Sequence, residues 1–227
     1  MAAPVFFDDI VTPFYEKVGL DYRRQVQIGQ LCYTHVLYAY ENRELWRPDH
    51  YDGTQTQAQV FRIVAAQADA YARNLPLASP KLETDEEFPV VRAKKRPVVV
   101  IRPVPAQVPI RPLAGGPRID WPLEIIVPTY SVVRKDDSAK FPPELIERVR
   151  RLEYPEFFFL PDRPGALSRD SFLRLARMTN CSPSHLEPTQ WKLADEALQV
   201  LLGQVRFYFQ GPYEGKYATA REMPLRP

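Results

Sequence analysis

Prolines constrain this chain most, because they limit how far any helix or strand can run. The 227 residues include 24 prolines, about twice the usual share of roughly 5%. Proline lacks a backbone donor, so helix interiors and central strands rarely contain it. Prolines crowd at 76–89 and 103–122. We therefore expect many short elements, joined by irregular connections at these two stretches.

The apolar pattern between the prolines predicts both strands and helices. Residues 26–40 alternate β-branched and aromatic side chains, which is typical of a strand. Pro97-Val-Val-Val-Ile101 reads as a buried strand, since proline is tolerated at a strand's first position. Further strands are expected at 123–127, 156–160 and 171–178, and helices at 8–18, 55–73, 142–152 and 192–209. This order predicts an α+β fold: a small, mostly antiparallel sheet closed into a barrel, with helices outside.

Composition bounds the class of protein. Hydrophobic residues make up 45% and charged residues 26%, which is ordinary for a soluble domain with a core. The two cysteines, Cys32 and Cys181, are isolated in sequence, which favours a reducing cytoplasm. Residues 1–19 carry charges and do not resemble a signal peptide. No apolar run approaches the roughly 20 residues of a membrane span. We expect a cytoplasmic protein with no membrane partner.

Basic and aromatic residues offer one candidate for nucleic-acid binding. The formal net charge is only +2, so such a role needs a local patch. The densest patch leads into the 97–101 strand, and two arginines on a later strand could extend it. Tyr130 could stack on bases, although strand aromatics also pack across strands, and charge runs also form solvated surfaces. The cations are Arg92, Lys94, Lys95, Arg96, Arg174 and Arg177.

Metal and cofactor chemistry has little support in the sequence. The histidines, His35, His50 and His185, are isolated from one another and from both cysteines, so no spacing resembles a zinc site. His50 alone has acidic neighbours. Cys181 lacks any signature of a nucleophile, and Gly115-Gly116 lacks that of a phosphate-binding loop. We therefore expect no metal and no cofactor.

Three pieces of the chain resemble the MazF/PemK family of endoribonuclease toxins. Gln27-Ile-Gly29-Gln-Leu31 is similar to the family's opening strand, and Arg96-Pro97-Val-Val-Val-Ile101 to its second strand. Residues 171–180, then Ser184-His-Leu186 and Lys192-Leu-Ala-Asp-Glu196-Ala-Leu198, resemble its last strands and closing helix. Together these pieces cover about half of the chain.

The resemblance implies a fold, an activity and partners. The fold would be an SH3-like barrel of the MazF/PemK/CcdB type, as one domain over 1–227. It would carry an N-terminal helical extension at 1–24, a helical insertion at 41–95 and a flexible tail at 211–227. The activity would be metal-independent cleavage of single-stranded RNA by a member of a toxin–antitoxin system. The implied partners are RNA, an antitoxin protein and a second copy in a homodimer.

The resemblance also assigns catalytic roles. Arg96 matches the family's arginine before the second strand and would stabilise charge on the phosphate. Thr129 or Ser131 would donate a hydrogen bond to the same phosphate. Thr129 lies one position before the place expected for the family's threonine, and Ala176 replaces an expected acidic residue. A catalytically inactive barrel module for protein or nucleic-acid binding is therefore the alternative, and a protein target, as for the related CcdB toxins, stays open as a third.

Overall fold

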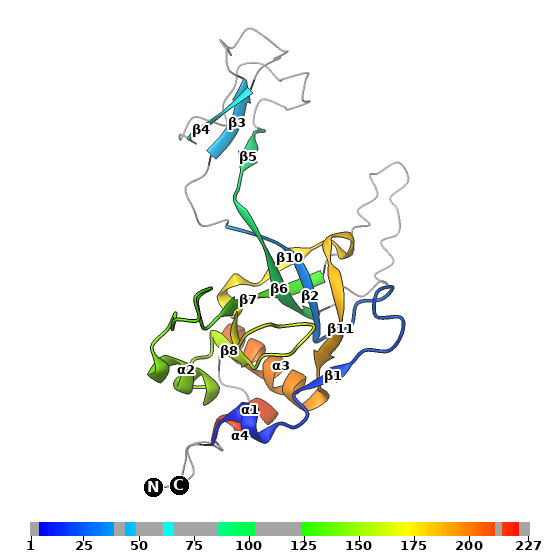
Figure 1. Cartoon of the computed structure of the whole chain (residues 1–227), viewed down its shortest axis with the longest axis vertical. Helices are drawn as coiled ribbons and strands as arrows, with labels where there is room; N and C mark the ends of the chain where they lie inside the picture. The colour runs from blue at the N-terminus through cyan, green and yellow to red at the C-terminus, as the bar shows by residue number, and fades with distance from the viewer. Residues whose placement is uncertain are drawn as a thin grey trace. The chain divides into compact units, whose positions relative to one another are not determined.

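The computed structural model describes residues 5–38, 44–48, 61–65, 86–102, 124–211 and 215–222. The chain divides into two compact units (Figure 1). The large unit comprises residues 1–34 and 95–227, and the small unit comprises residues 35–94. Each unit is described by itself below.

The main sheet has eight strands in the order β1-β11-β2-β6-β7-β9-β8, with β10 paired to β7. Six of its pairings, β1–β11, β11–β2, β6–β7, β7–β9, β7–β10 and β8–β9, are antiparallel. The strands are β1 Tyr15–Lys17, β2 Gln30–Leu37, β6 Ala93–Arg102, β7 Glu124–Ser131, β8 Phe157–Leu160, β9 Ser171–Arg174, β10 Thr179–Cys181 and β11 Glu187–Leu193. The prediction of an α+β fold with a mostly antiparallel sheet is confirmed.

All helices among the described residues belong to the large unit. They are α1 Phe7–Ile10, α2 Pro143–Arg150, α3 Asp195–Gln210 and α4 Lys216–Glu222, with short 3-10 turns η1 Leu175–Arg177 and η2 Pro183–His185. The longest, α3, has Asp195 and Glu196 in its first turn, where negative charges interact favourably with the helix dipole. Gly211 ends it with φ 84°, a left-handed conformation that glycine adopts without strain.

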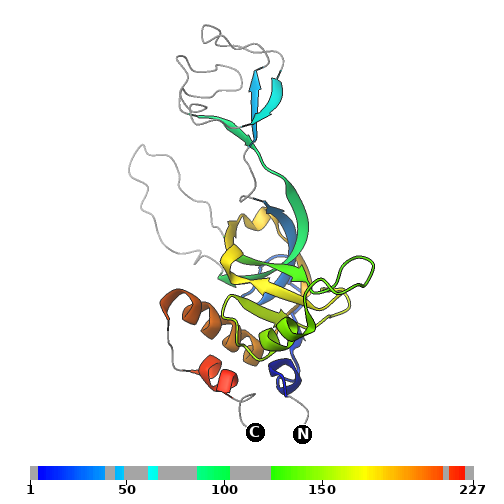
Figure 2. The ribbon, with the colours of Figure 1, turned by 90° about the vertical axis from the view of Figure 1, so that its left-hand side faces the viewer.

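The main sheet is covered on both faces. On one face α3 packs Leu198 and Leu201 into a core with Val99, Val127 and Leu173. On the other face α2 contributes Val149 to a smaller cluster, whose other buried members are Val132, Phe159 and Phe172. Figure 2 shows α3 and α2 on either side of the strands. The second cluster supports the aromatic side chains discussed below.

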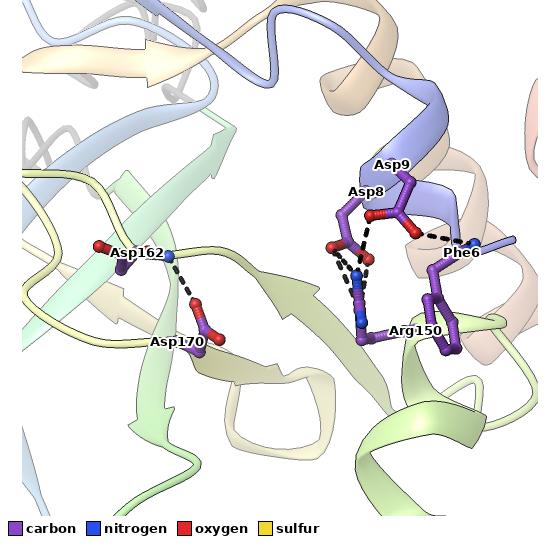
Figure 3. A network of polar contacts seen from close by, with 6 residues as sticks. All are labelled: Phe6, Asp8, Asp9, Arg150, Asp162 and Asp170. Atoms are coloured by element: carbon purple, nitrogen blue, oxygen red, sulfur yellow. Dashed lines mark hydrogen bonds and ion pairs between the residues drawn. The ribbon is translucent and has the colours of Figure 1, made fainter. Parts of the chain in front are cut away.

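An arginine joins α2 to α1 (Figure 3). The Arg150 guanidinium donates from Nε and Nη2 to the Asp8 carboxylate, at 2.8 and 2.6 Å, and from Nη2 to Asp9 at 3.1 Å. It also stacks on Phe6, with 3.9 Å between Cζ and the ring centroid. The Asp8 side chain is only 7% exposed. Because this carboxylate is buried, it depends on Arg150 as its counter-ion.

A close approach joins α4 to α3. A Cβ added at Gly203 would lie only 2.5 Å from Cβ of Tyr217, so only glycine fits here without a shift. Tyr217 is 1% exposed. The sequence predicts a flexible tail over 211–227, whereas residues 216–222 form a helix anchored by this tyrosine. The burial depends on a non-local contact, which local sequence does not reveal.

The small unit contains a three-stranded antiparallel sheet in the order β4-β3-β5. Its strands are β3 Glu44–Pro48, β4 Phe61–Ala65 and β5 Phe88–Val90. The predicted helix over 55–73 is therefore wrong at Phe61–Ala65; its other residues lie outside the described ones. An apolar run this short is compatible with the spacing of a helix and with that of a strand. It forms a strand because it pairs with β3.

Most other predicted elements appear with shifted bounds. The predicted strands at 26–40, 97–101, 123–127 and 156–160 contain or overlap β2, β6, β7 and β8. The predicted helix over 8–18 is wrong beyond α1, because residues 15–17 pair with β11 as β1. The predicted strand over 171–178 ends at Arg174 and continues as η1. No helix among the described residues is long and apolar enough to cross a membrane.

Candidate nucleic-acid interface

Arg96 and Tyr130 form a cross-strand pair on the main sheet. Antiparallel β6 and β7 align Val98 with Pro128 and Val99 with Val127. Continuing this register by two residues places Arg96 opposite Tyr130, on the same face of the sheet. The Arg96 guanidinium carbon lies 4.7 Å from the Tyr130 ring centroid, within cation–π range. Both side chains are half-buried.

A second cation reaches the same ring from the segment between β7 and α2. Lys140 Nζ lies 5.8 Å from the centroid of Tyr130 and 5.3 Å from that of Phe141. The Lys140 backbone is fixed, since its N–H donates to the Val132 carbonyl at 3.0 Å. Lys140 itself is exposed. Tyr130 therefore has two cations within 6 Å of its ring.

Tyr130 lies next to a buried aromatic cluster on the neighbouring strand. Tyr130 is aligned with Phe172 in the β7–β9 ladder, and Phe172 is 1% exposed. Phe172 contacts Phe141 and Phe157, with ring centroids 5.3 and 5.7 Å apart. Tyr130 thus neighbours a packed aromatic layer.

Arg174 adds a second cation and aromatic pair to this face. It is aligned with Phe157 in the β8–β9 ladder, and its guanidinium carbon lies 5.8 Å from that ring. Arg174 follows Phe172 by two residues, so both side chains point to the same side of β9. Its Nε is buried and has no hydrogen-bond partner among the described residues. We call Arg96, Tyr130, Lys140, Phe157 and Arg174 the cationic–aromatic face.

The hydroxyls proposed for catalysis are used within the protein. Thr129 is 3% exposed and donates from Oγ1 to the Pro97 carbonyl at 3.0 Å. As the strand neighbour of Tyr130, Thr129 points to the opposite face of the sheet. Ser131 donates from Oγ to the Val133 carbonyl at 2.8 Å. Both hydroxyls therefore already have an acceptor within the protein.

The basic run from Arg92 to Arg96 crosses the boundary between the two units, and its side chains alternate between the two faces of β6. Arg92 and Lys94 belong to the small unit, where Arg92 lies over Tyr38 at 5.9 Å. Lys95 forms an ion pair with Glu187 at 2.6 Å. Alternation along β6 turns Arg96 to the other face, towards Tyr130. Of the two basic residues that belong to the large unit, Lys95 and Arg96, only Arg96 joins the cationic–aromatic face. Arg177, in η1, is half-buried and is not among its residues.

Two members of the face were not predicted from sequence. Lys140 has no local signal, because only the turn that returns the chain to β7 brings it to Tyr130. Phe157 is within a predicted strand, and its partner Arg174 becomes apparent only with the β8–β9 register. Local periodicity does not show which aromatic residue a cation on the neighbouring strand will face.

The two cysteines lie elsewhere in the large unit, Cys32 buried and Cys181 half-buried. Burial first, and then Glu124 and Cys181, raise the pKa of the Cys32 thiol to about 12. Cys32 is therefore a protonated core thiol at neutral pH and not a nucleophile. Thr34 Oγ1 lies 3.5 Å from Cys181 Sγ. Among the described residues no group of three His, Cys, Asp or Glu side chains could hold a metal ion; His50 lies outside them.

Comparison with known proteins gives no match: no protein-family model and no curated protein matches the chain.

Proposed function

We propose that this protein binds single-stranded RNA through the cationic–aromatic face. The observation that carries the proposal is the Tyr130 ring with Arg96 and Lys140 both within 6 Å of its centroid. A base stacked at this ring would bring its own phosphates near both cations. Stacking on aromatic side chains beside positive charge is how proteins hold unpaired nucleic acid.

The charge balance of the two units supports the same face. The small unit has seven Lys and Arg against nine Asp and Glu, a net charge of −2. The whole chain has 30 Lys and Arg and 28 Asp and Glu. The large unit therefore has 23 basic and 19 acidic residues, a net charge of +4. The large unit is thus the more attractive to a polyanion.

The finer fold is part of the proposal. A MazF/PemK-type barrel needs a sheet that curls until distant strands meet. In the strand order β6 and β7 separate β2 from β10, yet Thr34 of β2 contacts Cys181 of β10 at 3.5 Å. This contact supports strong curling. Membership of the toxin family, a cytoplasmic location, an antitoxin partner and a homodimer stay proposals that rest on the sequence resemblance.

Metal-free RNA cleavage is the second candidate. The position of Arg96 beside an aromatic platform favours it, because a guanidinium there could stabilise a developing phosphorane. The engaged hydroxyls of Thr129 and Ser131 favour binding alone. Binding therefore ranks first, and cleavage is tested in the same samples.

The test is fluorescence anisotropy with a labelled single-stranded RNA of about 16 nucleotides, in EDTA. Arg96→Ala and Lys140→Ala should each weaken binding and reduce the slope of log affinity against log salt by about 0.7, because each removes one phosphate contact. Lys135→Ala, an exposed cation outside the face, is the matched control and should leave the slope unchanged. Equal losses in all three variants, or no binding by folded wild type, would contradict the proposal.

Gel analysis of the same samples addresses cleavage. RNA cut by wild type in EDTA, and left intact by Arg96→Ala, would establish a metal-independent ribonuclease centred on β6. Binding without cutting would establish the inactive module.

A further inference from the structure

A pocket of about 160 Å³ lies among three helices of the large unit. Its apolar walls include Phe7 of α1, Val11 just after it, Val200 of α3 and Ala220 of α4. Figures 1 and 2 show α1 and α4 close together on the same side of α3. The pocket is separate from the cationic–aromatic face, since it contains none of that face's residues.

The walls of the pocket are held by specific contacts. With four and seven residues, α1 and α4 are too short to be stable helices on their own. Arg150 fixes α1 through Asp8 and Asp9 (Figure 3), and Tyr217 fixes α4 against Gly203. The pocket is thus bounded by anchored elements.

Two opposite charges line the pocket. Glu196 of α3 and Lys216 of α4 are both exposed. Neither forms an ion pair within 4 Å with the other, nor with any other described residue. A ligand in this pocket would therefore meet an apolar chamber, an available carboxylate and an available ammonium group.

We propose that this pocket binds a free α-amino acid with a branched apolar side chain, such as leucine. The side chain enters between Val11 and Val200, the α-carboxylate pairs with Lys216 and the α-ammonium pairs with Glu196. Charges of both signs select a zwitterion over a fatty acid or an amine. Size agrees, because a cavity of about 150 Å³ accepts benzene, whereas drug-sized ligands need about 300–1,000 Å³.

The experiment titrates the ¹³C-methyl-labelled full-length protein with L-leucine and follows the methyl signals of Val11 and Val200 by NMR. We expect saturable shifts below about 10 mM, a range suited to a ligand of few atoms. The probes 4-methylpentanoate and isoamylamine keep the side chain and only one charge each, and should bind at least fivefold more weakly. No saturable shift with leucine, or equal binding of either probe, would overturn the proposal.

Variants assign the contacts. Glu196→Gln and Lys216→Met should each weaken leucine binding about tenfold, since each removes a charge-assisted hydrogen bond. Glu144→Gln and Lys135→Met make the same changes at exposed sites outside the pocket and should have no effect. Val200→Phe and Ala220→Leu fill the pocket from opposite walls, so either one, if folded, should abolish binding. Retained affinity in a folded, filled variant would show that leucine binds elsewhere.

Discussion

The two units differ in the exposure of their aromatic side chains and in the charges beside them. In the large unit the buried Phe172, 1% exposed, is aligned with Tyr130, whose ring has Arg96 and Lys140 within 6 Å of its centroid. In the small unit Trp46 is 42% exposed and is aligned across its sheet with Ile63 at 57% and Phe88 at 36%. On the opposite face of that sheet the described Leu45 is buried, at 0% exposed. The acidic unit thus exposes an apolar row that contains two aromatic residues, whereas the basic unit places cations beside its aromatic ring. Only the second arrangement suits a polyanion.

The largest effect is expected in the core of the large unit. Leu173→Ala removes a fully buried side chain between β7 and β8. Such truncations destabilise by about 2–5 kcal/mol, because transfer energy is lost and a cavity remains. Urea unfolding monitored by circular dichroism measures the change. A loss below about 1 kcal/mol, the size of a typical surface effect, would mean that this core is loosely packed.

Arg150→Met should have the next largest effect. The substitution keeps an apolar stem but leaves the buried Asp8 carboxylate without its counter-ion. Breaking a buried ion pair costs about 3–5 kcal/mol, and we expect about 2–3 kcal/mol because Arg150 is 23% exposed. Thermal unfolding of this variant is compared with that of the double variant Arg150→Met, Asp8→Asn. If the second change recovers none of the loss, the ion pair is not its cause.

Glu124 gives a pH-dependent prediction. Burial raises the pKa of its carboxyl above the usual value, so the folded state holds the proton more tightly than the unfolded state. Glu124 therefore destabilises the fold progressively as the pH rises from the unfolded pKa through the folded one. Glu124→Gln should be more stable than wild type at pH 7, with the difference shrinking at pH 4. An advantage that is constant across this range would contradict the sign of the shift.

The smallest effect is expected in the small unit. Trp46→Ser changes a side chain that already faces solvent in part, so the free energy of unfolding should change by less than about 0.5 kcal/mol. The same denaturation measurement checks this. A loss comparable to that of Leu173→Ala would show that the aromatic row is a core, and the contrast between the units would fail.

The local sequence pattern predicted the elements that have a clear apolar periodicity. It missed those whose structure depends on contacts with residues distant in the sequence. The run Val98–Ile101 indicates a buried strand by itself, and the stripe of α3 indicates a helix. Residues 61–65 form a strand because β3 pairs with them, and α4 is ordered because Tyr217 meets Gly203. At the site, the sequence suggested Arg96 and Tyr130 separately. The sequence could not show that Thr129 points to the opposite face, because a shift of one residue in strand register reverses the face to which a side chain points.

The most direct test compares Tyr130→Ala with Trp46→Ala in single-stranded RNA binding at fixed salt. Loss of a stacking ring weakens binding by about 1–3 kcal/mol, or roughly fivefold to a hundredfold. We predict this loss for Tyr130→Ala, near-normal affinity for Tyr130→Phe, and wild-type affinity for Trp46→Ala. If Trp46→Ala weakens binding and Tyr130→Ala does not, RNA is held by the exposed row of the small unit and the cationic–aromatic face is not the interface.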